Sequence, residues 1–485
     1  MSSTRTEKPA VRSGAVVAVL ALAGIVVSLM QTLIIPIIPK LPEYLHAAPD
    51  DTAWTVTATL LAAAVATPTM GRLGDMYGKR RLLLVSVVLM TAGSIVGALS
   101  STVLTMIIGR TLQGLSAGVI PLGISILRDV VPKEKLAGSV AVMSASLGVG
   151  GAFGLPIAAL IADNASWHML FWVSAVLGAV SFVAIAVIVP ESPERSGGGF
   201  DVAGAVTMSA GLVALLLGVS KGASWGWTST ATLGCFIVAV IAFAAWTAWE
   251  LRARTPLVDV RVAARPQVLF TNIASVAFGF AMFATSMVFP QVVQLPEATG
   301  SGLGGSLLVA GLVMAPMGLM LLLAAPVSSR ITNSAGPRTT LMLGAVIVAA
   351  GYFGGAYFLD AEWQLVLIGV VIGAGTGLAY GAMPALIMGA VPASQTGAAN
   401  SFNTLMRSLG TSFASAVSGV IVAQMTVTLG GREFASGEAF STIMLIAGGA
   451  AVLALLATCA IPRSSGLETS AVNVDAERES VAAPH

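Results

Sequence analysis

The stretch GRLGDMYGKRR, Gly71 to Arg81, places five charged side chains within eleven residues. Only 9% of the 485 residues are charged, and long runs of Leu, Val and Ala flank this stretch on both sides. A basic cluster between two apolar runs is typical of a cytoplasmic connection between membrane spans, because Lys and Arg are enriched on that side. A topology signal needs no acid, so Asp75 requires a separate explanation.

The composition is that of a membrane protein. Hydrophobic residues make up 56% of the chain and the mean hydropathy is +0.91, whereas soluble domains average about 45–50% apolar and about 25% charged residues. The net charge of +2 does not suggest a nucleic-acid partner. The sequence shows no phosphate-binding loop, no dinucleotide fingerprint and no metal-ligand spacing among its three histidines. We therefore expect no enzyme, no cofactor, no metal site and no ATP-driven transport.

Fourteen apolar runs are long enough to cross a bilayer, since a span needs roughly 20 residues. They predict an all-α membrane protein with spans near 14–38, 52–71, 81–100, 102–127, 136–162, 167–189, 202–220, 229–249, 267–290, 304–327, 339–359, 364–390, 399–424 and 439–461.

The distribution of basic residues predicts the orientation. An even number of spans places both termini on one side of the membrane. Nineteen of the 24 Lys and Arg residues fall on that side, two lie within spans, and three fall on the other side: Lys40, Lys221 and Arg432. Both termini are then cytoplasmic by the positive-inside rule, and the Ala-, Gly- and Val-rich composition indicates a bacterial inner (cell) membrane.

The opening stretch recurs later in the chain. GRLGDMYGKRRLL at 71–83 aligns with SRITNSAGPRTTL at 329–341, and each follows the second span of a six-span block. Parallel six-span halves build alternating-access transporters with a substrate site near the midplane. The predicted segments are a cytoplasmic tail (1–13), a first half (14–190), a linker with two inserted spans (191–266), a second half (267–461) and a disordered cytoplasmic tail (462–485).

These motifs resemble those of the major facilitator superfamily. Residues 71–81 resemble its motif A, RTLQGLSAG at 110–118 resembles its motif B, and fourteen spans in this order resemble its drug:proton antiporters. The resemblance implies the major facilitator fold and a conformational switch formed by Gly71, Arg72, Gly74, Asp75, Gly78 and Arg80.

Two departures from the family pattern weaken the antiport signal. The antiporter motif C has a Gly-Pro pair followed by two glycines, whereas here Leu155 separates Gly154 from Pro156, and alanines replace the later glycines. Gly150, Gly154 and Pro156 are what remains of this motif. In the first span, relatives often carry an Asp where this chain has Met30, with Gln31 beside it.

Several polar residues lie within predicted spans. Arg110 lies about eight residues into the fourth span, roughly 12 Å deep, where an Arg costs at least about 2.5–3.5 kcal/mol. It should therefore face a cavity and take part in coupling, or else donate to helix carbonyls as a structural residue. Gln113 and Gln31 suit substrate binding and interhelical hydrogen bonding equally.

The thirteenth span carries a polar stripe at helical spacing, formed by Asn400, Asn403, Arg407 and Thr411. This stripe should face inward, as an interdomain latch or, second, as part of the cavity. The candidate substrate pocket comprises Trp54, Phe278, Met282, Phe283 and Gln291, for which ordinary packing is the alternative.

None of the 22 acidic residues falls near the middle of a predicted span, although a carboxylate is the usual proton carrier in such pumps. A cavity with Arg110 and Arg407 would be net positive and would favour neutral, zwitterionic or anionic amphiphiles. Asp75 lies at the C-terminal end of the second span, where the helix dipole disfavours an anion. It should contact a cation or the start of the thirteenth span, near Ala398–Ser401.

The sequence thus predicts a monomeric exporter of small amphipathic molecules, embedded in lipid and driven by protons. A proton-coupled or facilitated importer of a polar solute and a non-transporting receptor with the same fold are the alternatives.

Overall fold

The computed structural model of the protein describes residues 13–192, 195–429 and 432–462, so the two terminal tails lie almost entirely outside the described residues. Within these ranges, fourteen helical segments are long and apolar enough to cross a membrane. This finding confirms the predicted number of spans and the all-α fold class.

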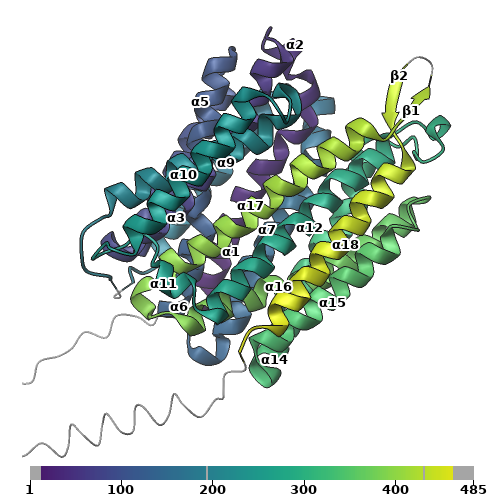
Figure 1. Ribbon diagram of the computed structural model, residues 1–485. Helices are drawn as coiled ribbons and strands as arrows, with labels where there is room; N and C mark the ends of the chain where they lie inside the picture. Colours follow the sequence, from purple (N-terminus) through teal and green to yellow (C-terminus); the bar gives the residue numbers. More distant parts are fainter. Residues whose placement is uncertain (1–12, 193–194, 430–431, 463–485) are drawn as a thin grey trace, which may run out of the picture.

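The first six spans form one lobe (Figure 1). Its elements are α1 (Ser13–Leu33), η1 (Ile35–Lys40), α2 (Leu41–Tyr44), α3 (Pro49–Tyr77), α4 (Lys79–Ala98), α5 (Val103–Gly114), η2 (Leu115–Gly118), α6 (Val119–Val130), α7 (Lys133–Asn164) and α8 (His168–Ile188). The fourth span is α5–η2–α6, and Thr102 begins it with a reciprocal capping box to Thr105.

The last six spans form the second lobe. Its elements are α12 (Pro266–Gln294), η3 (Glu297–Thr299), α13 (Leu307–Leu323), α14 (Ala325–Ala335), α15 (Pro337–Gly355), α16 (Glu362–Ala390), η4 (Ala393–Gln395), α17 (Thr396–Gln424), β1 (Thr426–Leu429), β2 (Arg432–Ala435) and α18 (Gly437–Cys459). The strands form an antiparallel hairpin that projects beyond the helices (Figure 1).

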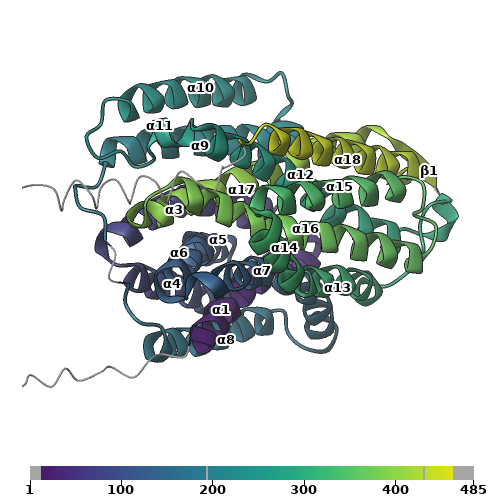
Figure 2. The same ribbon diagram turned by 90° about the horizontal axis from the view of Figure 1, so that it is seen from below.

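The two inserted spans are α9 (Val202–Trp225) and α10 (Thr230–Glu250), followed by the short α11 (Val260–Ala263). Helix α9 packs against α3 of the first lobe and α17 of the second, whereas α10 packs chiefly on α9. Figure 2 shows α10 at the outer edge of the molecule. Helix α9 therefore borders the seam between the lobes, and α10 covers its outer side.

The repeated motif has the same backbone form in both lobes. Helix α3 ends at Tyr77 and α4 begins at Lys79, with Gly78 at φ +114° between them; α14 and α15 meet in the same way at Gly336, with φ +85°. Backbone with positive φ favours glycine, so these two positions set the corners. Residues 71–81 were expected to follow the second span, but residues 71–77 form the last turns of that span, helix α3.

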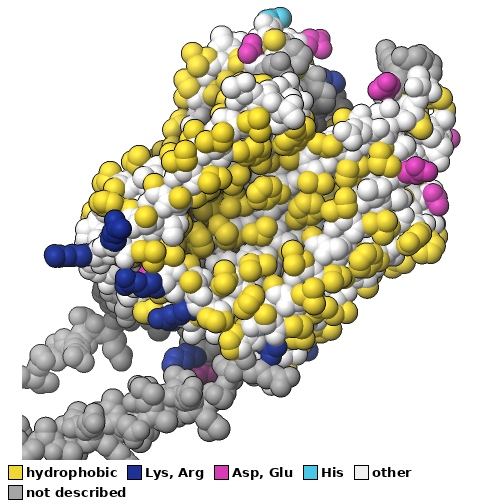
Figure 3. All heavy atoms as spheres, in the orientation of Figure 1, with side chains coloured by type: hydrophobic (Ala, Val, Ile, Leu, Met, Phe, Trp, Pro, Cys, Tyr) yellow, Lys and Arg dark blue, Asp and Glu magenta, His cyan; other side chains and the backbone are white. Residues whose placement is uncertain are grey.

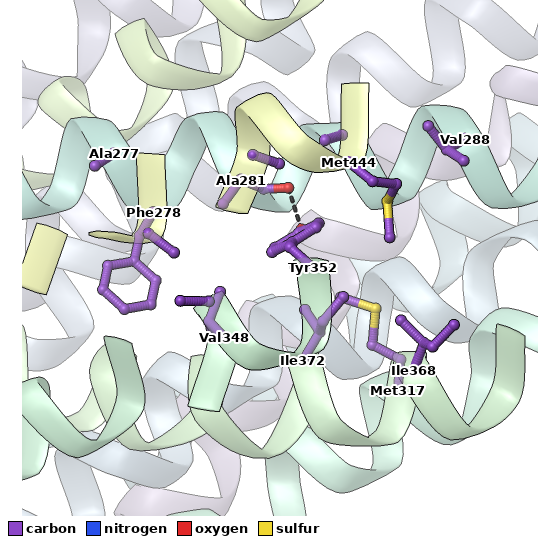
Figure 4. Packing of buried hydrophobic residues seen from close by; sticks show 14 of the residues in the cluster. Ala277, Phe278, Ala281, Val288, Met317, Val348, Tyr352, Ile368, Ile372 and Met444 are labelled. Carbon is purple, nitrogen blue, oxygen red and sulfur yellow. Dashed lines mark hydrogen bonds between the residues drawn. The ribbon is translucent and has the colours of Figure 1, made fainter. Parts of the chain in front are cut away.

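Each lobe has its own apolar core. In the second lobe, Phe278, Met317, Tyr352 and Met444 pack between α12, α13, α15 and α18, as Figure 4 shows. The Tyr352 hydroxyl donates to the carbonyl oxygen of Ala281 on α12. Hydroxyl groups buried in this way need such a partner, because an unpaired polar group is costly in an apolar interior.

The lobes meet along two seams. Helix α7 packs against α13, α14 and α16, and α17 packs against α3 and α6.

Figure 3 shows Lys and Arg side chains gathered at one end of the molecule, beside α11 and α14, and Asp and Glu side chains at the other, near the β hairpin. We call these the basic end and the acidic end.

Candidate functional site

Asp75 joins the two lobes at the basic end. Its side chain is completely buried, and its carboxylate accepts hydrogen bonds from the backbone N–H groups of Gly397 (3.1 Å) and Ala398 (2.8 Å). These groups belong to the first turn of α17, where free N–H groups and the helix dipole stabilise an anion. The predicted contact between Asp75 and the start of the thirteenth span is therefore present. We call it the Asp75 latch.

Small residues allow this close approach. A Cβ atom added at Gly71 would lie 2.6 Å from the carbonyl oxygen of Gly397, and one added at Gly397 would lie 2.6 Å from the Asp75 carboxylate. Gly74 faces Leu122 of α6 at a distance that leaves no room for a side chain. Gly71 and Gly397 thus keep α3 and α17 within hydrogen-bonding distance, and Gly74 allows α3 to pack closely on α6.

Arg128, in the last turn of α6, makes a second connection between the lobes. Its guanidinium donates to the carbonyl oxygens of Val391 (3.1 Å) and Pro392 (3.3 Å) and to the hydroxyl of Thr396. In the sequence, Arg128 counts only as a marker of orientation, so this role was missed. The signal that could have found it is its position at the end of the span that carries motif B.

The basic residues of motif A are more than a topology signal. Lys79 is fully buried and forms a 2.5 Å ion pair with Asp129. Arg80 donates to the carbonyl of Ala186, and Arg72 donates to the Ser196 hydroxyl at 3.1 Å. These contacts fix α4 to α6 and α8 and tie the linker to α3. The orientation signal therefore explains only part of this cluster.

A cavity of about 280 Å³ lies between the lobes. Five predicted residues line it: Gln31 from α1, Met282 and Phe283 from α12, and Arg407 and Thr411 from α17. Among the described residues in its lining, Arg407 is the one charged side chain, and its guanidinium lies 4.7 Å from the ring centre of Tyr380. A cation over an aromatic face is stabilised without a carboxylate partner.

The inserted helix α9 also reaches this cavity. Leu216 of α9 lines it together with Leu60 and Ala64 of α3 and Leu405 of α17. The sequence offered no signal for this contribution, because α9 reads as an ordinary apolar span. One lining residue therefore comes from outside the two six-helix halves.

Arg110 and Gln113 do not line this cavity, so the cavity interpretation of both residues is corrected. Both are buried within the first lobe. Arg110 donates to the Gln113 side chain at 2.7 Å and to the carbonyl of Thr55 at 3.4 Å, while Gln113 donates to Ser94 at 2.9 Å. These hydrogen bonds join α5 to α3 and α4. They also supply the acceptors that polar groups buried away from water require.

Asn400 and Asn403 were expected to act as an interdomain latch, and for Asn403 this expectation is wrong. Asn403 donates to Asn272 (2.8 Å) and Ser275 (2.7 Å) of α12, which belongs to the same lobe. Asn400 donates to the carbonyl of Thr396 within its own helix. The connection between the lobes is formed instead by backbone N–H groups of α17, at the place that the position of Asp75 predicted.

Three further pocket candidates lie outside the cavity lining. Phe278 belongs to the core of the second lobe, with 1% of its surface exposed. Gln291 is not among the lining residues. Trp54 lies at the acidic end of α3, with the Lys221 ammonium 5.0 Å from its ring. Of the predicted pocket residues in α12, Met282 and Phe283 therefore line the cavity, whereas Phe278 packs in the core.

The residues left from motif C form helix contacts. A side chain at Gly150 or Gly154 would collide with α1, at Ile25 and Thr32 respectively, and Gly311 of α13 packs directly on Pro156. Helix α7 is thus held tightly against both α1 of its own lobe and α13 of the other. The altered motif keeps the close packing of this seam.

The fold and this site define a two-lobed membrane transporter with a cavity between its halves. The family model "Major Facilitator Superfamily" matches residues 20–415 and, in a second match, 271–483. The chain belongs to the Major Facilitator Superfamily and is one of its transporters.

Curated relatives carry names of drug resistance and export. The chain is 28% identical over 408 residues to the "Tetracenomycin C resistance and export protein" of Streptomyces glaucescens, covering 83% of this chain and 74% of that protein. It is 25% identical over 380 residues to "Multidrug resistance protein 3" of Bacillus subtilis (strain 168), covering 77% and 72%.

Two solved structures share the fold. The human organic anion transporter MFSD10 aligns with a TM-score of 0.65 at 14% identity, covering 92% of this chain and 99% of that one. The proton:xylose symporter XylE aligns with a TM-score of 0.62 at 16% identity, covering 93% and 96%. At such identities the likeness concerns the fold alone.

Proposed function

We propose that the protein exports small amphipathic molecules from a bacterial cell by proton-coupled alternating access. The observation that carries the proposal is the Asp75 latch, which closes the basic end across the two lobes while a cavity lies between them. The drug-resistance names of its relatives favour export. Rocking of the lobes would break the latch and expose the cavity to the opposite side.

The basic end faces the cytoplasm in this proposal. Lys and Arg gather there and acids at the other end (Figure 3), in accordance with the positive-inside rule. With the basic end closed by Asp75 and Arg128, the described arrangement corresponds to an outward-facing state. The chain then works as a monomer in the inner membrane, with both termini in the cytoplasm.

The cavity favours certain substrates. Its wall is mainly apolar, with hydroxyl groups from Thr404, Ser408 and Thr411 and the single charge of Arg407. An uncompensated guanidinium repels lipophilic cations and pairs with carboxylate or phenolate oxygens. We therefore propose neutral, zwitterionic or anionic amphiphiles as substrates, taken up through apolar contact with Met282 and Phe283.

Asp75 is the proposed site of proton coupling. The charged carboxylate is stabilised by the α17 N-terminus, and a proton on it removes the charge that this helix end attracts. Protonation therefore loosens the latch and favours opening of the basic end. A proton entering from outside would open the cytoplasmic side to load substrate, and its release there would close that side again.

A liposome assay tests this function. Purified protein is reconstituted, a pH gradient is imposed, and uptake of a panel of anionic, neutral and cationic amphiphiles is followed. We expect accumulation against the concentration gradient that requires an acidic lumen, collapses with a protonophore and favours anionic and neutral compounds. Dependence on external acid would instead indicate an importer, and preference for lipophilic cations would contradict the proposed substrate class.

A further inference from the structure

A second cavity, distinct from the one between the lobes, lies at the basic end. Its volume is about 390 Å³, and six parts of the chain line it: α3, the linker at 195–197, the segment 254–263 that follows α10, the start of α12, the segment 391–395 and the start of α17. It therefore adjoins the Asp75 latch on the side of the linker, where Ser196 donates its backbone N–H to the carbonyl oxygen of Asp75 at 2.7 Å.

Three arginines line this cavity: Arg72, Arg195 and Arg254. Within the described residues, the ion pairs are Lys79–Asp129 and Arg81–Glu191, so none of the three takes part in one. Arg195 and Arg254 are exposed, and no hydrogen bond from their side chains is present among those residues. Three positively charged side chains therefore line one cavity.

Arg72 brings a buried guanidinium with an unused donor to this cavity. Only 7% of its surface is exposed, yet its Nε–H has no hydrogen-bond partner in the described part of the chain. One terminal nitrogen donates to Ser196, and the Asp75 carboxylate acts on it electrostatically. A buried guanidinium with an unused donor is costly unless an acceptor completes it.

The one carboxylate in the described lining is already engaged. Asp259 accepts hydrogen bonds from the backbone N–H groups of Arg261 (2.9 Å) and Val262 (3.3 Å) at the start of α11. The lining therefore holds three guanidinium groups against one carboxylate, and within the described residues that carboxylate forms no ion pair with any of them. The remaining wall is largely apolar and includes Leu257, Val268 and Phe402.

We propose that this cavity binds a phosphate group carried by an amphiphile, held by Arg72, Arg195 and Arg254 and tying the linker to both lobes beside the Asp75 latch. Arg guanidinium groups match phosphate oxygens in bidentate geometry, and the apolar wall accepts the carbon skeleton. Two sources share this chemistry: the headgroup of an anionic lipid and a soluble cytoplasmic phosphate. The inference does not depend on which compound the protein transports.

The test uses the full-length protein in nanodiscs and two probes. Phosphatidylglycerol, mixed one to three with phosphatidylcholine, is measured as lipid retained in native mass spectrometry. Inorganic phosphate is titrated against chloride at equal ionic strength in phosphatidylcholine nanodiscs, with thermal unfolding as the readout. The variant is the double substitution Arg195→Gln/Arg254→Gln. The matched control, Arg252→Gln/Arg330→Gln, removes two exposed charges at the same end but outside this cavity.

We expect at least one probe to bind the wild type and the control about tenfold or more tightly than the double variant, since hydrogen bonds to charged groups are lost. Retention of phosphatidylglycerol alone identifies a lipid headgroup, and stabilisation by inorganic phosphate identifies a soluble ligand. If neither probe distinguishes wild type from the double variant, or if the control loses binding equally, the proposal is overturned. Neither readout involves transport, so failure here is separate from failure of the proposed function.

Discussion

The Asp75 carboxylate of one lobe lies 2.8 Å from the backbone nitrogen of Ala398 in the other, at the first turn of α17. A side chain of motif A thus binds main-chain atoms across the seam. Because the acceptor is charged, each such hydrogen bond is worth about 1.5–3 kcal/mol. Protonation of this one carboxylate should therefore shift the equilibrium between the states with the basic end closed and open.

Replacing Asp75 by Asn should abolish most transport while leaving the protein folded. The amide keeps one acceptor oxygen but loses the charge that the α17 N-terminus stabilises. We expect a reduction of tenfold or more in proton-driven uptake, with normal expression and an unchanged elution profile. Asp360→Asn, at an exposed position of the acidic end, serves as the control; wild-type rates in Asp75→Asn would contradict a role in the transport cycle.

Gly71→Ala should weaken the latch without touching Asp75. The added methyl group would lie 2.6 Å from the Gly397 carbonyl and would collide with Ser401, so α3 and α17 must move apart. We expect reduced transport and faster labelling of cysteines placed at the basic end. Gly419→Ala, where a Cβ meets open space, should behave as wild type. Equal labelling rates for the two variants would show that the seam tolerates the methyl group.

Arg407→Gln should change which substrates are accepted. It removes the one charge in the described cavity lining and leaves Tyr380 without its cation. We predict that KM for anionic amphiphiles rises about tenfold, as expected for the loss of a charge-assisted contact, while neutral compounds change little. Arg407→Lys should keep part of the preference. If the maximal transport rate fell equally for all compounds while KM stayed unchanged, Arg407 would have a purely structural role.

The Lys79–Asp129 pair should contribute to stability. Both side chains are almost entirely buried, so Lys79→Met leaves an unpaired carboxylate at a cost of about 3–5 kcal/mol. The double variant Lys79→Met/Asp129→Asn should recover much of this loss, because no isolated charge remains. Thermal unfolding in detergent measures both. Additive destabilisation in the double variant would mean that the two residues act independently.

Much of the fold was predictable because membrane spans require long apolar runs, and every span found contains one. The repeat at 71–83 and 329–341 also indicated the two halves. Asp75 was predictable for a physical reason: an anion at a helix C-terminus needs compensation. In contrast, sequence alone cannot tell whether a polar side chain in a span faces its own lobe or the other. For that reason Asn403 and Arg110 were placed wrongly, and the contribution of Leu216 was missed.

Double electron–electron resonance tests whether protonation of Asp75 opens the basic end. It measures the distance between two spin labels placed at that end. The labels are placed at Tyr77→Cys on α3 and Asn333→Cys on α14, both exposed, after replacement of the native Cys235 and Cys459. We predict a short distance at neutral pH that lengthens on acidification, and a long distance at both pH values in Asp75→Asn. A short distance at both pH values in Asp75→Asn would contradict the proposed latch.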